Sequence, residues 1–72
     1  MKSSEVVREA MKIDGLSQKA LAERCGKTTQ SYVGNALLNK NGMGVDKFVE
    51  FMNAMGYDVI VRRGKTEMVV TE

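Results

Sequence analysis

The chain has 72 residues, which suffice for one small domain with a thin core and argue against an enzyme with a deep catalytic cleft. Its 43% apolar and 28% charged residues are typical of a folded globular protein, and a net charge of +2 does not by itself identify a nucleic-acid partner. The single Cys25 and the absence of histidine exclude an internal disulfide and an ordinary zinc site, so we expect no metal and no other cofactor. No apolar run approaches the roughly 20 residues of a membrane span, so we expect a cytoplasmic protein without a membrane partner.

Two helices are predicted in the first part of the chain. The first covers residues 4–14, with Ser3 or Ser4 as its cap and Gly15 at its end. Its apolar face is formed by Val6, Val7, Ala10, Met11 and Ile13. Ser17 is expected to cap the second helix, and Gly26 is expected to end it. The apolar positions of the second helix are Leu21, Ala22 and Cys25, with Leu16 packing onto Leu21 from outside the cap.

A third helix follows the second after a turn of a few residues. Thr28 or Thr29 is expected to cap it. Its apolar positions are Tyr32, Val33, Ala36 and Leu37. Two helices separated by a few residues that include a glycine have the spacing of a helix-turn-helix unit. Gly34 lies inside the third helix, where it costs up to about 1 kcal/mol relative to alanine. The sequence allows it two roles equally, close approach to DNA or relief of packing.

A fourth helix and a β-hairpin are predicted after a polar loop at residues 39–44. The fourth helix covers residues 45–55 and ends at Gly56, and its apolar positions are Val45, Phe48, Val49, Phe51, Met52 and Met55. The apolar period then changes to two, and residues 63–65 are expected to form the turn of a hairpin within residues 57–72. Tyr57, Val59 and Val61 are expected to pack on the helices. Core-filling roles are expected for Met43, Met52, Met55 and Met68. The predicted fold is a mainly α single domain, in which a four-helix helix-turn-helix core at residues 1–56 precedes a C-terminal hairpin.

The segment from Ser17 to Gly26 carries a recognisable motif. The motif has the spacing Ser-Gln-x-x-Leu-Ala-x-x-x-Gly, and its residues here are Ser17, Gln18, Leu21, Ala22 and Gly26. The segment from Gln30 to Asn35 follows it. This pattern resembles the helix-turn-helix family of Cro and the phage repressors, and the likeness covers about residues 5–57. The resemblance implies a dimeric transcriptional regulator, most simply a repressor, that binds double-stranded DNA with its third helix in the major groove. The turn aligns with or without one extra residue, which leaves the phase of that helix open by one position.

Residue chemistry and charge then suggest the DNA contacts. Short hydroxyl and amide side chains at the start of the third helix are suited to base edges, and Gln30 is the best single candidate. The residues expected to contact bases are Thr28, Thr29, Gln30, Ser31 and Asn35. Between residues 17 and 41 there are four basic residues against Glu23 alone, which favours contact with the DNA backbone there. The residues expected to contact phosphates are Ser17, Gln18, Lys19, Lys27 and Lys40.

The predicted hairpin has apolar residues on both faces, and an isolated two-stranded hairpin is marginally stable in water. A homodimer would cover this surface, through edge-to-edge pairing or through facing sheets. The residues expected at such an interface are Ile60, Met68, Val69 and Val70. The alternative is a monomer whose hairpin folds back on its own helices. Arg62, Arg63 and Lys65 at the turn could instead contact phosphates, but a charged turn is usually only solvated, so phosphate contact is the weaker interpretation.

Three other interpretations remain open from the sequence. The helical pair is also compatible with a plain helical hairpin whose threonines, glutamine and serine only cap helices and face solvent. A second alternative is an antitoxin-like protein-interaction module that binds a toxin or another protein, with DNA binding secondary or lost. An enzyme is the poorest fit, because the sequence shows neither a nucleophile–base pair nor paired carboxylates in a plausible cleft.

Overall fold

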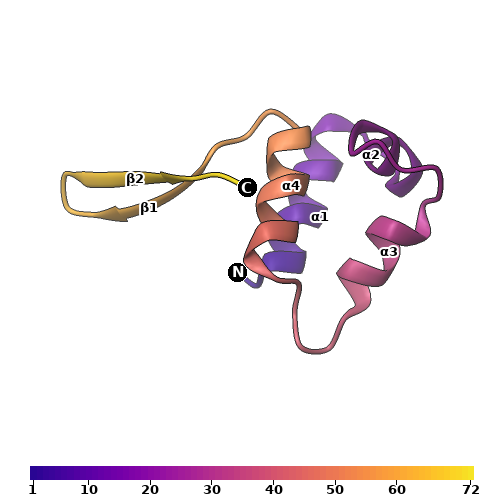
Figure 1. The fold of residues 1–72 in the computed structure, drawn as a ribbon, viewed down its shortest axis with the longest axis horizontal. Coiled ribbons are helices and arrows are strands. Elements are labelled where there is room, and N and C mark those ends of the chain that lie inside the picture. Colours follow the sequence, from indigo (N-terminus) through magenta and orange to yellow (C-terminus); the bar gives the residue numbers. More distant parts are fainter.

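Four helices are followed by a two-stranded antiparallel hairpin in the computed structural model, which describes residues 1–72 (Figure 1). The helices are α1 (Ser3–Asp14), α2 (Gln18–Arg24), α3 (Ser31–Leu38) and α4 (Val45–Ala54), and the strands are β1 (Val59–Arg63) and β2 (Thr66–Val70). The mainly α class and the C-terminal hairpin predicted from the sequence are confirmed. None of the four helices has both the length and the apolar composition that crossing a bilayer requires.

The core is formed by apolar residues contributed by all four helices. Val7 of α1, Leu21 of α2, Val33 of α3 and Phe51 of α4 are each 0% exposed. Tyr57 and Val59 pack against the edge of this core, as the sequence predicts. No polar or charged residue is buried, so the core depends on apolar packing alone.

The helix ends agree with the predicted boundaries to within a few residues, but two of the predicted caps are wrong. Lys2 rather than Ser3 or Ser4 is the N-cap residue of α1, and its backbone N–H donates to the Glu5 carboxylate at 3.2 Å. Gln30 rather than Thr28 or Thr29 precedes α3. Thr29 Oγ1 instead lies 2.9 Å from Ser31 Oγ, so this hydroxyl bonds a neighbouring side chain and no side chain caps the helix.

Four apolar residues predicted to be buried are exposed. Ile13 lies in the last turn of α1 and Val45 begins α4, and they are 67% and 66% exposed because neither helix end is covered by a neighbouring element. Val61 and Met68 are 52% and 60% exposed, because they form a cross-strand pair beyond the part of the hairpin that touches the helices. The apolar periodicity of the sequence identified the apolar face of each helix and strand. How much of that face is buried depends on how far the neighbouring helix or strand extends along it.

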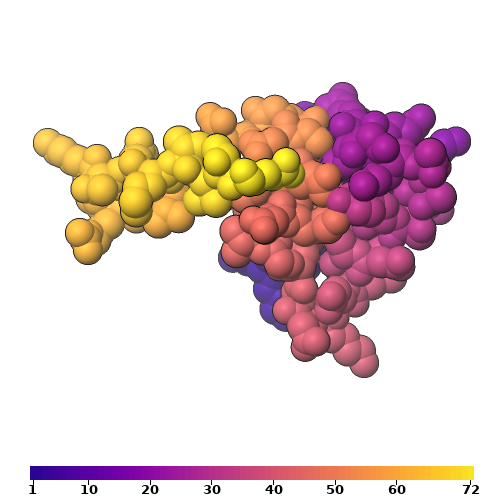
Figure 2. All heavy atoms as spheres, in the orientation of Figure 1, coloured from indigo at the N-terminus to yellow at the C-terminus, as the bar shows by residue number.

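The hairpin projects from one end of the helical body, and α3 lies toward the other end (Figure 1). Figure 2 shows the same arm in yellow with its tip free of the body. The strands are in register from the pair Val59–Val70 to the pair Arg63–Thr66. Gly64 begins the two-residue turn with φ +58°, and no non-glycine residue has a positive φ. A glycine at the first central position suits the type II′ turn that matches the twist of paired strands.

Candidate nucleic-acid interface

The side chains predicted to contact DNA lie on α2, on the turn after it and on α3. Ser17 caps α2, and its Oγ accepts a hydrogen bond from the Ala20 N–H at 3.0 Å. A serine hydroxyl that accepts one bond can still donate its own proton, so Ser17 remains able to bond a phosphate oxygen. The turn from Cys25 to Gln30 passes through Gly26, which has φ +76°. Val33 and Leu37 anchor α3 in the core and leave the opposite side of the helix in solvent.

Gly34 lies at the contact between α2 and α3. A Cβ atom at this position would be 2.9 Å from Oε1 of Gln18, closer than van der Waals contact allows. The absent side chain therefore gives room to the half-buried Gln18 at the start of α2. Of the two roles open for Gly34, the structure supports packing between the two helices. Gln18 is consequently in contact with α3 rather than fully extended into solvent.

The exposed side of α3 carries short polar side chains and one apolar side chain. Ser31 and Asn35 are exposed and are four residues apart, so they lie on the same face of the helix one turn apart. Gln30 stands just before the first turn and is also exposed. Leu38, which the sequence analysis did not single out, is 75% exposed at the end of α3. The sequence pattern did not predict this exposure, because a leucine next to the buried Leu37 is expected to be buried as well.

In the structure α3 starts at Ser31. Gln30 is the last residue before the helix, and Thr28 and Thr29 lie in the turn and are exposed. The predicted base-contacting residues therefore form two groups, with Gln30, Ser31 and Asn35 on or at the start of α3. Thr28 and Thr29 form the second group, in the turn that leads into α3.

The predicted phosphate-contacting lysines are all free of ion pairs. Lys19, Lys27 and Lys40 are exposed, and the only salt bridge of the protein joins Lys47 to Glu50 at 3.6 Å. Lys27 Nζ lies 4.9 Å from the centre of the Tyr32 ring, a cation–π distance that holds this charge beside the first turn of α3. Lys19 is on α2 and Lys40 is just beyond α3, so the basic groups flank α3 from different elements.

Tyr32 joins α3 to α4 through a cluster that sequence analysis missed. Its hydroxyl donates to Oε1 of Glu50 and accepts from Nζ of Lys47, and Nζ also lies 3.7 Å from the ring centre. The ring meets Phe51 edge-on, with centroids 5.9 Å apart. The bond to Glu50 raises the pKa of Tyr32, and the bond to Tyr32 raises the pKa of Lys47. Only the fold, which lets the Tyr32 side chain of α3 reach α4, brings these groups together, and no local sequence signal marks it.

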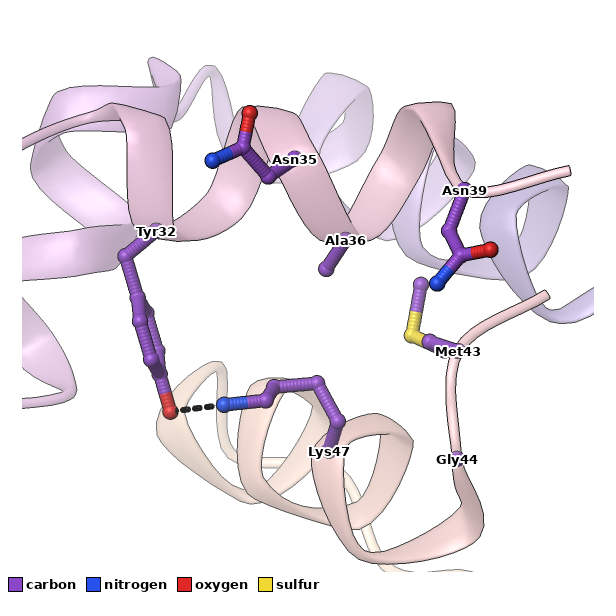
Figure 3. Close-up of a pocket in the computed structure, with 7 residues that line it drawn as sticks. All are labelled: Tyr32, Asn35, Ala36, Asn39, Met43, Gly44 and Lys47. Atoms are coloured by element: carbon purple, nitrogen blue, oxygen red, sulfur yellow. Dashed lines mark hydrogen bonds between the residues drawn. The ribbon is translucent and has the colours of Figure 1, made fainter. Parts of the chain in front are cut away.

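A groove of about 320 Å³ separates α3 from the start of α4. Tyr32, Asn35 and Asn39 all line this groove. Figure 3 shows Tyr32 and Asn39 pointing from the chain of α3 toward α4, whereas the exposed Asn35 turns its amide away from Lys47. This orientation keeps its amide available to a ligand on the outer face of α3.

A second, fully polar hollow of about 460 Å³ lies where the start of α1 meets the loop after α3. Its lining residues are Lys2, Ser3, Ser4, Asn39, Lys40, Asn41 and Gly42. Lys2 was not among the predicted contacts, because it is remote from the motif in sequence. The fold brings its charge to the same hollow as Lys40.

Cys25 is half-buried and carries no sign of reactivity. Burial, followed by the nearby charge of Glu50, raises the pKa of its thiol. A raised pKa keeps the thiol protonated and poorly nucleophilic near neutral pH. No three side chains among the cysteine, aspartates and glutamates cluster closely enough to hold a metal ion.

The predicted dimer residues lie on both faces of the hairpin. Ile60 pairs with Val69 across the strands, and these two are 47% and 60% exposed. Met68 is exposed on the other face, whereas Val70 is half-buried next to the helices. Three of the predicted dimer residues, Ile60, Met68 and Val69, therefore lie on the exposed part of the hairpin, which we call the arm. Val70 lies at its half-buried root beside the helices.

Comparisons with protein-family models, with curated proteins and with solved structures found no match to this chain.

Proposed function

We propose that this protein is a homodimeric, sequence-specific double-stranded DNA-binding protein that regulates transcription, with α2, the turn and α3 acting as a helix-turn-helix unit. The observation that carries the proposal is the outer side of α3. It presents Gln30, Ser31 and Asn35 to solvent while Val33 and Leu37 fix the helix from behind. Short amide and hydroxyl side chains on a rigid helix are suited to base edges in the major groove.

The flanking charges support contact with the DNA backbone. Lys19, Lys27 and Lys40 have no acidic partner, so binding a phosphate would not require breaking an ion pair. Such contacts release counterions and provide affinity that depends on salt, while base contacts provide specificity. Occlusion of RNA polymerase from a promoter would then make the protein a repressor.

The spacing of a twofold DNA site constrains how two copies associate. Recognition helices in successive major grooves are about 34 Å apart. The longest dimension of one copy is 39 Å, and the hairpin and α3 lie toward opposite ends of this axis (Figure 1). Two copies that met only at their hairpin tips would separate their α3 helices by much more than that spacing. The arms in the proposed dimer therefore overlap instead of meeting end to end.

The test is selection of bound sequences from random duplexes, followed by fluorescence anisotropy at two salt concentrations. The wild type is expected to select a consensus with twofold symmetry. Gln30→Ala and Asn35→Ala are expected to weaken binding and relax the preference at particular positions, by about 1–3 kcal/mol for each lost bidentate contact. Asn53→Ala is the matched control, because Asn53 is an exposed amide on α4 and not on α3.

A protein-interaction module of the antitoxin type is the second candidate. The exposed apolar residues of the hairpin favour it, because such a surface also suits a different protein. Duplex binding that is weak, insensitive to sequence and abolished by salt would support this candidate over the DNA-binding regulator.

A further inference from the structure

Two of the uncovered apolar surfaces of the protein lie close to each other, and the first is one face of the arm formed by the hairpin. Val61 and Met68 are cross-strand partners and share one face of it, because side chains alternate along a strand. They continue the face whose root, Val59 and Val70, is half-buried near the helices. Two strands without cover on this face are marginally stable in water, so a binding partner for the face is expected.

The second uncovered surface is an open groove of about 220 Å³ beside α1. Six of its seven lining residues are apolar, and the full set is Met1, Val6, Glu9, Ala10, Ile13, Met52 and Tyr57. Ile13 is 67% exposed, although it lies on the apolar side of α1. Tyr57 belongs to the segment that leads into β1, so the groove adjoins the root of the arm.

We propose that the groove beside α1 is the docking site for the hairpin arm of a second copy of this chain, and that the exchange is reciprocal. Val61 and Met68 of each arm then pack onto Val6, Ile13 and Met52 of the other copy. One twofold arrangement covers the Val61–Met68 face and the groove in both copies, as an isologous interface requires, while the exposed pair Ile60–Val69 on the other face of the arm stays outside this contact. Pairing of the hairpins with each other alone would leave the groove of each copy exposed.

Charge and length are complementary between the arm and the groove. Glu9 is the only charged residue that lines the groove, and the arm carries Arg62, Arg63 and Lys65 near its tip. Arg63 lies on the same face as Val61, two residues further along β1. Five strand residues span roughly 17 Å and the 12 residues of α1 span roughly 18 Å, so an arm laid along α1 matches its length.

The first experiment measures the dimer dissociation constant by sedimentation equilibrium without DNA. It rests on the homodimer of the proposed function but not on DNA binding, so the two can fail separately. Ile13→Glu and Val61→Glu are each expected to raise the constant at least about tenfold, because each puts a charge into an apolar contact. Leu38→Glu is the matched control, since Leu38 is also an exposed apolar residue but lies on α3, outside both surfaces. Circular dichroism checks that each variant keeps its helices.

A charge exchange tests the pairing of arm with groove. Glu9→Arg and Arg63→Glu are each expected to weaken the dimer, and the double variant is expected to recover most of the lost affinity. A dimer that is weakened by Val61→Glu but not by Ile13→Glu or Glu9→Arg would overturn the groove as the docking site, in favour of hairpin-to-hairpin pairing. A wild type that stays monomeric at all concentrations would overturn the exchange itself, whatever the duplex selection shows.

A cross-link provides the direct readout in a background that carries Cys25→Ala. Copies with Ile13→Cys are mixed with copies with Val61→Cys under mild oxidation. Disulfide-linked heterodimers are expected to form in preference to linked homodimers of either variant. Linkage that forms only between two Val61→Cys copies would contradict the proposal.

Discussion

At the scale of single residues, Tyr32 connects α3 to α4 and the core. Its hydroxyl donates to Glu50, and this bond raises its pKa, so the folded protein holds the phenolic proton more tightly than the unfolded chain does. The stabilisation is therefore fully present below the ordinary pKa of about 10 and is lost as the pH rises through the higher pKa of the folded state. The raised pKa of Lys47 changes stability in the same direction and over the same alkaline range.

Tyr32→Phe is expected to reduce this alkaline sensitivity. The free energy of unfolding of the wild type should fall between about pH 8 and about pH 11 by more than that of the variant, because the variant has no phenolic proton to lose. Urea unfolding at the two pH values measures the difference. Tyr57→Phe is the control, since Tyr57 makes no hydrogen bond through its hydroxyl in the structure and should keep the wild-type pH dependence.

Two effects on stability oppose each other when Gly34 is replaced by alanine: the gain in helix propensity and the close contact with Gln18. Alanine at this position gains up to about 1 kcal/mol of helix propensity, and its Cβ meets only the far end of a flexible glutamine side chain. We therefore expect Gly34→Ala to displace Gln18 and still to stabilise the protein, raising Tm by a few degrees. Thermal unfolding measures the change, and Gln18→Ala with Gly34→Ala should be at least as stable as Gly34→Ala alone. A clear loss of stability in the single variant would mean that Gln18 is held rigidly on α3.

At the scale of elements, local sequence signals were sufficient to predict the helices and the hairpin, but not to predict which of their apolar residues are buried by neighbouring elements. Glycines and apolar periodicity predicted all four helices, because these signals act within a few residues of chain. The burial of Ile13 and Val61 was predicted wrongly, since it depends on where other elements end. The motif likewise placed Gln30 and Asn35 near α3, while the Tyr32–Lys47–Glu50 cluster depends on how the fold places α4 within reach of the Tyr32 side chain.

The hairpin is expected to be the least protected element when the protein is monomeric. Only its root contacts the helices, and few buried contacts oppose opening of the strands. Amide hydrogen exchange of β1 and β2 should be fast in dilute solution and should slow as the concentration rises and dimers form. The amides of α4, which lies in the core, serve as the internal control because their protection should not depend on concentration. Equal exchange of the hairpin at all concentrations would contradict a role in association.

At the scale of the whole molecule, the arrangement of charge separates two hypotheses about DNA. Lys27 and Lys40 flank α3, whereas Lys65 lies at the tip of the hairpin, at the other end of the long axis (Figure 1). If phosphates are bound around α3, the lysines there determine how affinity depends on salt, and Lys65 does not. If the basic turn of the hairpin also binds phosphates, all three lysines contribute.

The salt dependence of binding to the selected duplex distinguishes these hypotheses. Each phosphate contact adds about 0.9 to the slope of log affinity against log salt, and a dimer loses two contacts for each lysine replaced. Lys27→Ala and Lys40→Ala are therefore each expected to reduce the slope by about 2 while leaving the consensus unchanged. If the arm is bound to the partner and α3 faces the DNA, as proposed, Lys65→Ala should leave the slope at its wild-type value. A reduced slope for Lys65→Ala would place the hairpin tip on the DNA backbone, which requires a dimer arranged differently from the reciprocal exchange along α1.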